Sequence, residues 1–129
     1  MIDHIGFMVA DHPRSRAFYV QALAPLGFAP MLDVTREQSG GYGSAGFGPP
    51  QQPQLWIGSA AAHGGAMHVA FAADSRADVD VFYAAALAAG GRDNGASGLD
   101  VHYQPNYYGA FALDPNGHNI EAVCHPPAG

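Results

Sequence analysis

An internal repeat constrains the fold of this chain more than any other feature. When the sequence is shifted by 64 residues, IDHIGFMVAD aligns with AMHVAFAADS, so that His4 matches His68 and Phe7 matches Phe71. Without a gap, eight of the 24 positions from His4 to Gly27 are identical. Alanine-rich helices match one another easily, but matched histidines and a matched Phe-Tyr pair do not. The chain is therefore predicted to fold as two similar modules.

Each module reads as one strand, one helix and three further strands. The first strand of each module is predicted by alternating small or polar and apolar residues. The helix starts are predicted at Asp11 with Pro13 in the first module and at Asp74 or Ser75 in the second. The helix ends are predicted at Gly27 and at Gly90-Gly91. The strands are expected near residues 2–9, 29–34, 41–47 and 54–58, and near 67–73, 99–103, 108–113 and 118–124. The turn DPNG, residues 114–117, joins the last two, and the Gly-, Pro- and Gln-rich residues 37–54 predict an adaptable loop around one weak strand.

This pattern predicts an α+β fold in which a βαβββ module is written twice. With 129 residues the chain is long enough for one domain, 1–129, and too short for two ordinary ones. The first module is expected to span about residues 1–60 and the second about residues 65–126.

Composition excludes several classes of function. The formal charge is −6, with five arginines and no lysine, so the basic face that nucleic acid requires is not expected. Neither a leader sequence nor a membrane span is recognisable, which makes a cytoplasmic protein the default expectation. The single cysteine, Cys124, excludes an internal disulfide and is expected to be a small buried hydrophobe.

The segment NIEAVCH places Glu121, one of only two glutamates, inside a predicted buried strand. A carboxylate there must be paired, protonated or bound to a metal. Strand alternation puts His4 and His68 on faces with small neighbours, which suits the floor of a cavity. Two imidazoles and one carboxylate suit a divalent iron, zinc, nickel or manganese ion. Each residue alone also fits a structural role, as a hydrogen-bonded core histidine or as a glutamate paired with an arginine, and the symmetry of the histidines favours the metal.

The opening DHIGFMVAD, the helix RAFYVQAL and the closing FALDPNGHNIEAV resemble the vicinal oxygen chelate superfamily over essentially the whole chain. That group includes glyoxalase I, extradiol dioxygenases, fosfomycin resistance enzymes and bleomycin resistance proteins. The resemblance implies that the modules form a cupped, barrel-like mixed sheet with helices outside, that the metal ligands are His4, His68 and Glu121, and that the chain forms a homodimer.

One departure from the family concerns a fourth ligand, a Glu or Gln in glyoxalase I. The matching stretch is QLWIG, where Trp56 aligns with the ligand position and Gln54 takes it after a slip of two residues. Because the glyoxalase I reaction uses that carboxylate as a base, the departure weakens the expectation of a strict glyoxalase reaction.

Polar aromatic residues of the segment DVHYQPNYYGAF are expected beside Glu121. Of His102, Tyr103, Tyr107 and Tyr108, the first candidates for proton donors or substrate-orienting groups are His102 and Tyr108; the alternative is that the tyrosines only pack. His118 is expected to be solvated in a turn.

The sequence thus predicts a metalloenzyme that acts on a small organic substrate, either a glyoxalase-like lyase or isomerase or an extradiol-type dioxygenase. The rival is a metal-free drug-binding protein of the bleomycin resistance type. No Rossmann glycine pattern, P-loop or Gly-x-Ser-x-Gly elbow is present, so nucleotide use and serine hydrolysis are not expected.

Overall fold

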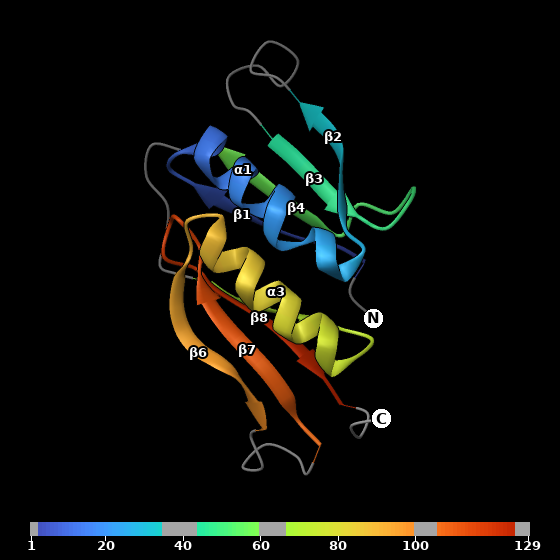
Figure 1. Ribbon diagram of the computed structural model, residues 1–129. Helices are drawn as coiled ribbons and strands as arrows, with labels where there is room; N and C mark the ends of the chain where they lie inside the picture. Colours follow the sequence, from blue (N-terminus) through green and yellow to red (C-terminus); the bar gives the residue numbers. More distant parts are fainter. Residues whose placement is uncertain (1–2, 35–43, 60–66, 100–105, 126–129) are drawn as a thin grey trace.

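The chain folds into two modules of the same topology, each a four-stranded sheet with one main helix (Figure 1). The computed structural model describes residues 3–34, 44–59, 67–99 and 106–125. The first module contains β1 (Ile5–Val9), α1 (His12–Ala22), η1 (Ala24–Leu26), β2 (Ala29–Val34), β3 (Ser44–Gly48) and β4 (Leu55–Ser59). The second contains β5 (His68–Ala72), α3 (Arg76–Ala88), β6 (Arg92–Leu99), β7 (Tyr108–Leu113) and β8 (Asn119–Cys124).

The strand order confirms the predicted duplication. The two sheets have the orders β1-β4-β3-β2 and β5-β8-β7-β6, which are the same order in each module. In both sheets the first strand runs parallel to the last and the remaining pairs are antiparallel. The result is the α+β architecture expected, with two separate mixed sheets rather than a closed barrel.

Both main helices begin at the predicted caps. The side chain of Asp11 accepts a hydrogen bond from the backbone N–H of Arg14, and Ser75 Oγ accepts one from Asp78. The helices lie on the same side of the two sheets and contact each other (Figure 1). The face of each sheet that is turned away from the helices is here called the outer face.

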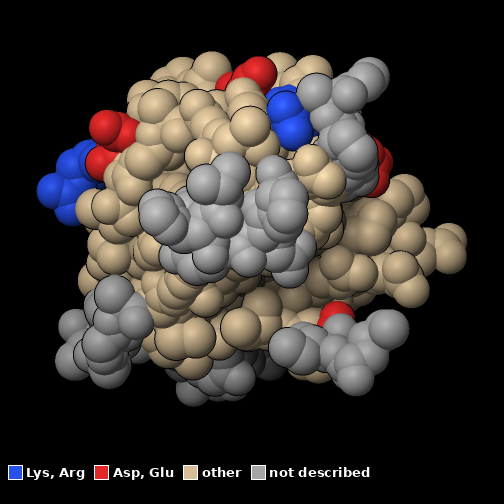
Figure 2. Space-filling model, turned by 90° about the horizontal axis from the view of Figure 1, so that it is seen from below, with Lys and Arg blue, Asp and Glu red and all other residues tan. Residues whose placement is uncertain are grey.

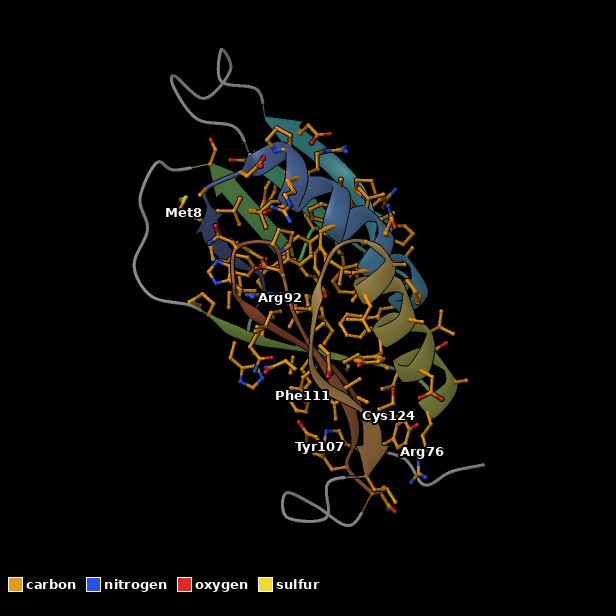
Figure 3. All side chains as sticks on the ribbon, turned by 60° about the vertical axis from the view of Figure 1, so that its left-hand side comes forward. Met8, Arg76, Arg92, Tyr107, Phe111 and Cys124 are labelled. Atoms are coloured by element: carbon orange, nitrogen blue, oxygen red, sulfur yellow. The ribbon has the colours of Figure 1, made fainter. Side chains whose placement is uncertain are left out.

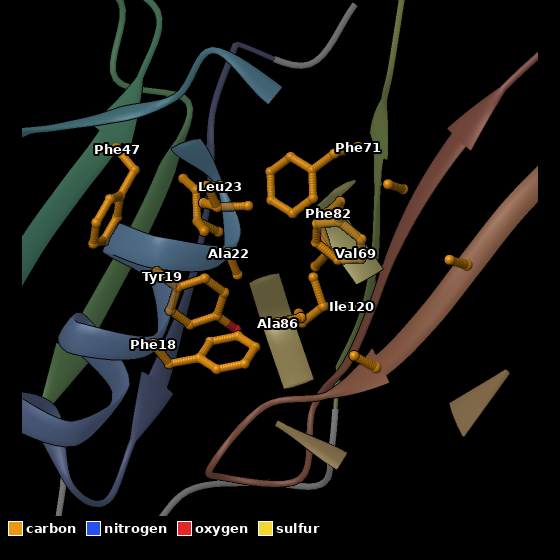
Figure 4. Packing of buried hydrophobic residues seen from close by; sticks show 14 of the residues in the cluster. Phe18, Tyr19, Ala22, Leu23, Phe47, Val69, Phe71, Phe82, Ala86 and Ile120 are labelled. Carbon is orange, nitrogen blue, oxygen red and sulfur yellow. The ribbon is translucent and has the colours of Figure 1, made fainter. Parts of the chain in front are cut away.

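One apolar core lies between the helices and the inner faces of both sheets (Figure 4). Fully buried aromatic side chains from both modules contribute to it, including Phe18, Tyr19, Phe47 and Phe82. Burial of such large side chains is the main stabilising contribution in a domain of this size. The expectation for Cys124 is confirmed, since it is buried in this core as a free thiol.

His118 joins the two modules, and the prediction that it is solvated is wrong. Its side chain is 1% exposed and packs against Phe7 with ring centroids 4.5 Å apart. Its Nδ1 accepts a hydrogen bond from the backbone N–H of Met67 (2.8 Å), so Nε2 carries the proton and donates to the carbonyl oxygen of Met8 (3.1 Å). The turn before β8 is buried because it docks onto β1, which no local pattern reveals.

The strand predicted at residues 99–103 begins much earlier, as β6 at Arg92. Gly, Asn and Asp are depleted in strands, so the sequence RDNGASGL gives little β signal. Pairing with β7 overrides that preference, with irregular register around Gly95, which has a φ of 143°. Residues 100–105 lie outside the described residues. The short helix η1 around Pro25 was also not predicted.

No helix in the described parts of the chain is both long and apolar enough to cross a membrane. The face seen in Figure 2 carries a few scattered arginines and acidic residues.

Candidate functional site

Strand alternation directs His68 onto the outer face, as the sequence predicts. In β5, Val69 and Phe71 are buried toward the helices, whereas His68, Ala70 and Ala72 are exposed on the other side. The side chain of His68 is 55% exposed, which leaves it accessible to a ligand.

Glu121 lies on the adjacent strand β8, on the same outer face, and is the buried partner of His68. It is 1% exposed, and its Oε1 lies 3.0 Å from Nε2 of His68. The parallel register places Glu121 beside Ala70, whose small side chain leaves room for this contact. The proximity of His68 and Glu121 is thus as the sequence led us to expect.

Tyr107 supplies the second contact to the carboxylate. Its hydroxyl donates a hydrogen bond to Oε2 of Glu121 across β7. Between them stands Gly109, where a Cβ would lie 3.2 Å from the same Oε2, so a larger residue there would crowd the carboxylate. Figure 3 shows Tyr107 and Phe111 close together, and Phe111 is the register partner of Glu121 on β7.

Tyr107, just before β7, and Tyr108, its first residue, point to opposite faces. The hydroxyl of Tyr108 donates to Asp80 on α3 (2.7 Å), and its ring lies under the guanidinium of Arg76 at 5.1 Å. The hydrogen bond to Asp80 raises the pKa of Tyr108 above its usual value. The structure therefore brings Tyr107, not Tyr108, to Glu121, and His102 lies outside the described residues. Alternation with Phe111 was the sequence signal that distinguishes the two tyrosines.

His4 stands apart from the His68–Glu121 pair. Its side chain is 57% exposed, and its Nδ1 is hydrogen-bonded to Asp3 at 2.8 Å. With Nδ1 bonded to Asp3, Nε2 is the nitrogen available to a ligand, an arrangement common in metal-binding histidines. His4 and His68 line a hollow of about 360 Å³ at the seam between the modules.

Within residues 3–34, 44–59, 67–99 and 106–125, no three His, Cys, Asp or Glu side chains form a group that could hold a metal by themselves. Two metal-ligand side chains nevertheless lie side by side. His68 and Glu121 present an imidazole nitrogen and a carboxylate oxygen side by side, a donor set that suits iron, zinc, nickel or manganese. The carboxylate is buried, and its described partners, His68 and Tyr107, carry no permanent positive charge. The residues present therefore fit a divalent cation, with Glu121 and His68 as its holders.

The strand register also identifies the residue that matches Glu121 in the first module. Glu121 pairs with Ala70 in the second module, and Trp56 pairs with Gly6 in the first. Since Gly6 and Ala70 match in the repeat, Trp56 occupies the position equivalent to Glu121. The register assigns that position to Trp56 rather than Gln54.

Two βαβββ modules of identical topology, with a histidine and a glutamate paired on the outer face, define a tandem-module protein of the vicinal oxygen chelate type. The sequence matches the family model of the Glyoxalase/Bleomycin resistance protein/Dioxygenase superfamily over residues 1–122, and the chain belongs to this superfamily. Among curated proteins none matches the sequence.

Solved structures of that superfamily share the fold. A glyoxalase/bleomycin resistance protein from Albidiferax ferrireducens has a TM-score of 0.74 and 24% identity, with 98% of this chain and 99% of that chain covered. A point mutant of glyoxalase I from Zea mays has a TM-score of 0.70 and 21% identity, covering 95% of this chain and 43% of that one. A point mutant of the fosfomycin resistance protein FosX from Listeria monocytogenes, complexed with Mn(II) and 1S,2S-dihydroxypropylphosphonic acid, has a TM-score of 0.69 and 16% identity, covering 95% and 90%.

Proposed function

We propose that this chain is a divalent-metal-dependent enzyme acting on a small organic substrate through adjacent oxygen atoms. The observation that carries the proposal is the buried carboxylate of Glu121, held 3.0 Å from the accessible His68. Burying a carboxylate without a cation is costly, and a metal at this pair offsets that cost. The Mn(II) named for the FosX complex, a protein of the same fold, also supports the use of a divalent metal.

The third ligand in this proposal is His4 of a second copy of the chain. His4 lies on the outer face of the first module and does not group with His68 and Glu121 in the described residues. The outer faces of both sheets are turned away from the helices, so a twofold-related copy can place its first module over this chain's second module. Such a homodimer has two sites, each built from both chains.

The bound metal supplies a Lewis acid that polarises substrate oxygens and stabilises a developing anion. The residues of the chain orient and shield the site. Tyr107 fixes one oxygen of Glu121, which leaves the other directed at His68. Trp56 replaces the fourth ligand and cannot accept a proton, so we favour a reaction that needs no protein base there, such as an extradiol-type oxygenation, over the strict glyoxalase reaction.

Metal content of untagged protein tests the proposal. Wild type should bind about one divalent ion per chain after loading, and His68→Ala and Glu121→Ala should lose it while remaining folded. Asp74→Ala is the control, since it removes an exposed carboxylate just before α3 and should bind metal normally. If no ion is retained after loading with iron, nickel, zinc or manganese, the metal-free binding protein becomes the better reading.

Mixing two inactive variants tests the shared site. A heterodimer of His4→Ala with Glu121→Ala contains one site with all three ligands and one with neither His4 nor Glu121. It should bind about one metal ion per dimer, although each parent binds none. A site built within one chain predicts no recovery in the mixture, and that outcome would remove the second copy from the proposal.

A further inference from the structure

The ring of Trp56 lies flat on the outer face of the first sheet. Three consecutive atoms of its six-membered ring lie 2.9, 2.9 and 3.1 Å from the point where a Cβ on Gly46 would stand. Contact at an edge of the ring would bring one atom much closer than its neighbours, so this similarity means that a ring face covers the glycine. Gly46 is the antiparallel partner of Trp56, and a side chain there would displace the ring.

The neighbouring strand leaves the same space open. Gly6 is the parallel partner of Trp56, and a Cβ on it would lie 3.4 Å from the Trp56 Cβ. In the second module the corresponding positions are Ala70, Glu121 and Phe111. The large and small residues are thus exchanged between modules: one sheet carries a carboxylate beside a phenylalanine, and the other carries an indole between two glycines.

Trp56 also lines a hollow. Trp56, His4 and residues 51–54 line a space of about 650 Å³, within the range of small-molecule sites. Gln51 on its rim has a φ of 67°, a left-handed conformation that costs energy in a residue other than glycine. Trp56 remains partly exposed rather than buried. An aromatic ring, glutamine amides and a histidine therefore line one hollow together.

We infer that the substrate is a flat, unsaturated ring that stacks on Trp56, with the glutamines bonding its substituents and its adjacent oxygens directed toward His4. The inference deepens the proposed function and rests on it only for the direction of the oxygens. Offset stacking on an indole favours a planar ring over a saturated ring of the same size by roughly three- to tenfold in affinity.

A structural role for Trp56 is the main rival. An aromatic side chain laid over a cross-strand glycine stabilises a sheet without any ligand. A purely structural role predicts no preference between flat and saturated rings. Ligand affinity, and not protein stability, therefore distinguishes the structural role from the stacking role.

The sequence has a single tryptophan, so fluorescence excited at a wavelength that tyrosine does not absorb reports on Trp56 alone. The probes are catechol and cis-1,2-cyclohexanediol, which carry the same adjacent oxygens on a flat and on a saturated ring. Catechol should quench the fluorescence and bind at least about threefold more tightly by calorimetry, both with metal and after chelation. Equal affinity of the two probes would overturn the inference, and this comparison needs no variant.

Variants at Trp56 then locate the effect. Trp56→Leu should reduce catechol binding to the level of cyclohexanediol while metal content stays unchanged, whereas Trp56→Phe should keep part of the preference. The wild type separates the two proposals: a preference for catechol with no ion retained after loading would leave the stacking surface standing and sink the metalloenzyme. Normal metal binding with no preference for catechol would do the reverse.

Discussion

Trp56 and Glu121 occupy the same place in the two modules, each beside the first strand of its own sheet, where Trp56 pairs with Gly6 and Glu121 with Ala70. At this shared position one module therefore carries a buried carboxylate and the other an indole. The first module therefore retains a histidine without its carboxylate partner.

Restoring that carboxylate should strengthen metal binding. In Trp56→Glu, position 56 lies on the strand beside His4 as Glu121 lies beside His68, so the proposed site gains a fourth protein ligand. We expect metal affinity to rise on the order of tenfold or more, measured by competition with a chelator. Trp56→Leu, which removes the indole without adding a donor, is the control. Equal affinities of the two variants would place position 56 outside the metal site.

Removing the Tyr107 hydroxyl should weaken metal binding without unfolding the protein. Tyr107→Phe deletes the donor to Oε2 of Glu121 and frees the carboxylate to rotate. Loss of such an orienting bond typically costs about 10- to 100-fold in metal affinity.

The adjacent Tyr108→Phe provides a matched control, because its hydroxyl contacts Asp80 on the helix side. It should leave the dissociation constant for metal unchanged. Similar losses in both variants would show that Tyr107 acts through general stability rather than through Glu121.

The fold was largely predictable because it follows from local rules applied twice. Period-two alternation placed Phe7 and Val69 inside and His68 outside, and two capping residues fixed the helix starts. The proximity of His68 to Glu121 followed from the same alternation once both strands belonged to one sheet. The weak β signal of residues 92–99 hid β6, since its stability comes from its partner β7.

The parts of the site that sequence could not give depend on register and docking. Alternation with Phe111 separates the faces of Tyr107 and Tyr108, but only the register of β7 against β8 decides which of these faces meets Glu121. The burial of His118 depends on how one module docks on the other. The distance of His4 from the His68–Glu121 pair depends on the same docking, and the described residues leave it outside that group.

The buried hydroxyl of Tyr19 should contribute measurably to stability. It donates to Asp114 Oδ2 at 2.6 Å in the core between the modules. Tyr19→Phe leaves that buried oxygen without this donor, and the free energy of unfolding in urea should fall by about 1–3 kcal/mol. Tyr83→Phe, which removes a surface hydrogen bond to Asp93, is the control and should have a much smaller effect.

The same pair has a predictable pH dependence. Burial, followed by the proximity of Asp114, raises the pKa of Tyr19 well above its usual value. A raised folded pKa means that this stabilisation is complete below the unfolded pKa of about 10 and is lost as the pH rises toward the folded value. The difference in unfolding free energy between wild type and Tyr19→Phe should therefore shrink in alkaline urea titrations. A constant difference across that range would contradict the assignment.

The surface ion pair of Arg16 and Asp33 should make a small contribution to stability that is lost at acidic pH. The hydrogen bonds from Arg16 lower the pKa of Asp33, so its stabilisation is present above the unfolded pKa of about 3.9 and lost as the pH falls below it. Because the side chains are 36% and 50% exposed, the effect of Asp33→Asn at neutral pH should stay below about 1 kcal/mol. It should also diminish in high salt. A loss that persists well below both the folded and the unfolded pKa of Asp33 would point to packing instead of charge.

Replacing His118 should loosen the junction between the modules. Its ring links the backbone N–H of Met67 to the carbonyl of Met8, and both groups lose their partner in His118→Ala. Both bonds are only part-buried, so each lost partner costs at most about 1–3 kcal/mol, and the lost contact with Phe7 adds to that. Hydrogen exchange should show increased opening at Met67 and Asn119, since Asn119 N–H donates to the carbonyl of Met67. His125→Ala, an exposed histidine, should leave these amides protected. Unchanged protection in His118→Ala would mean that the apolar core alone holds the two modules together.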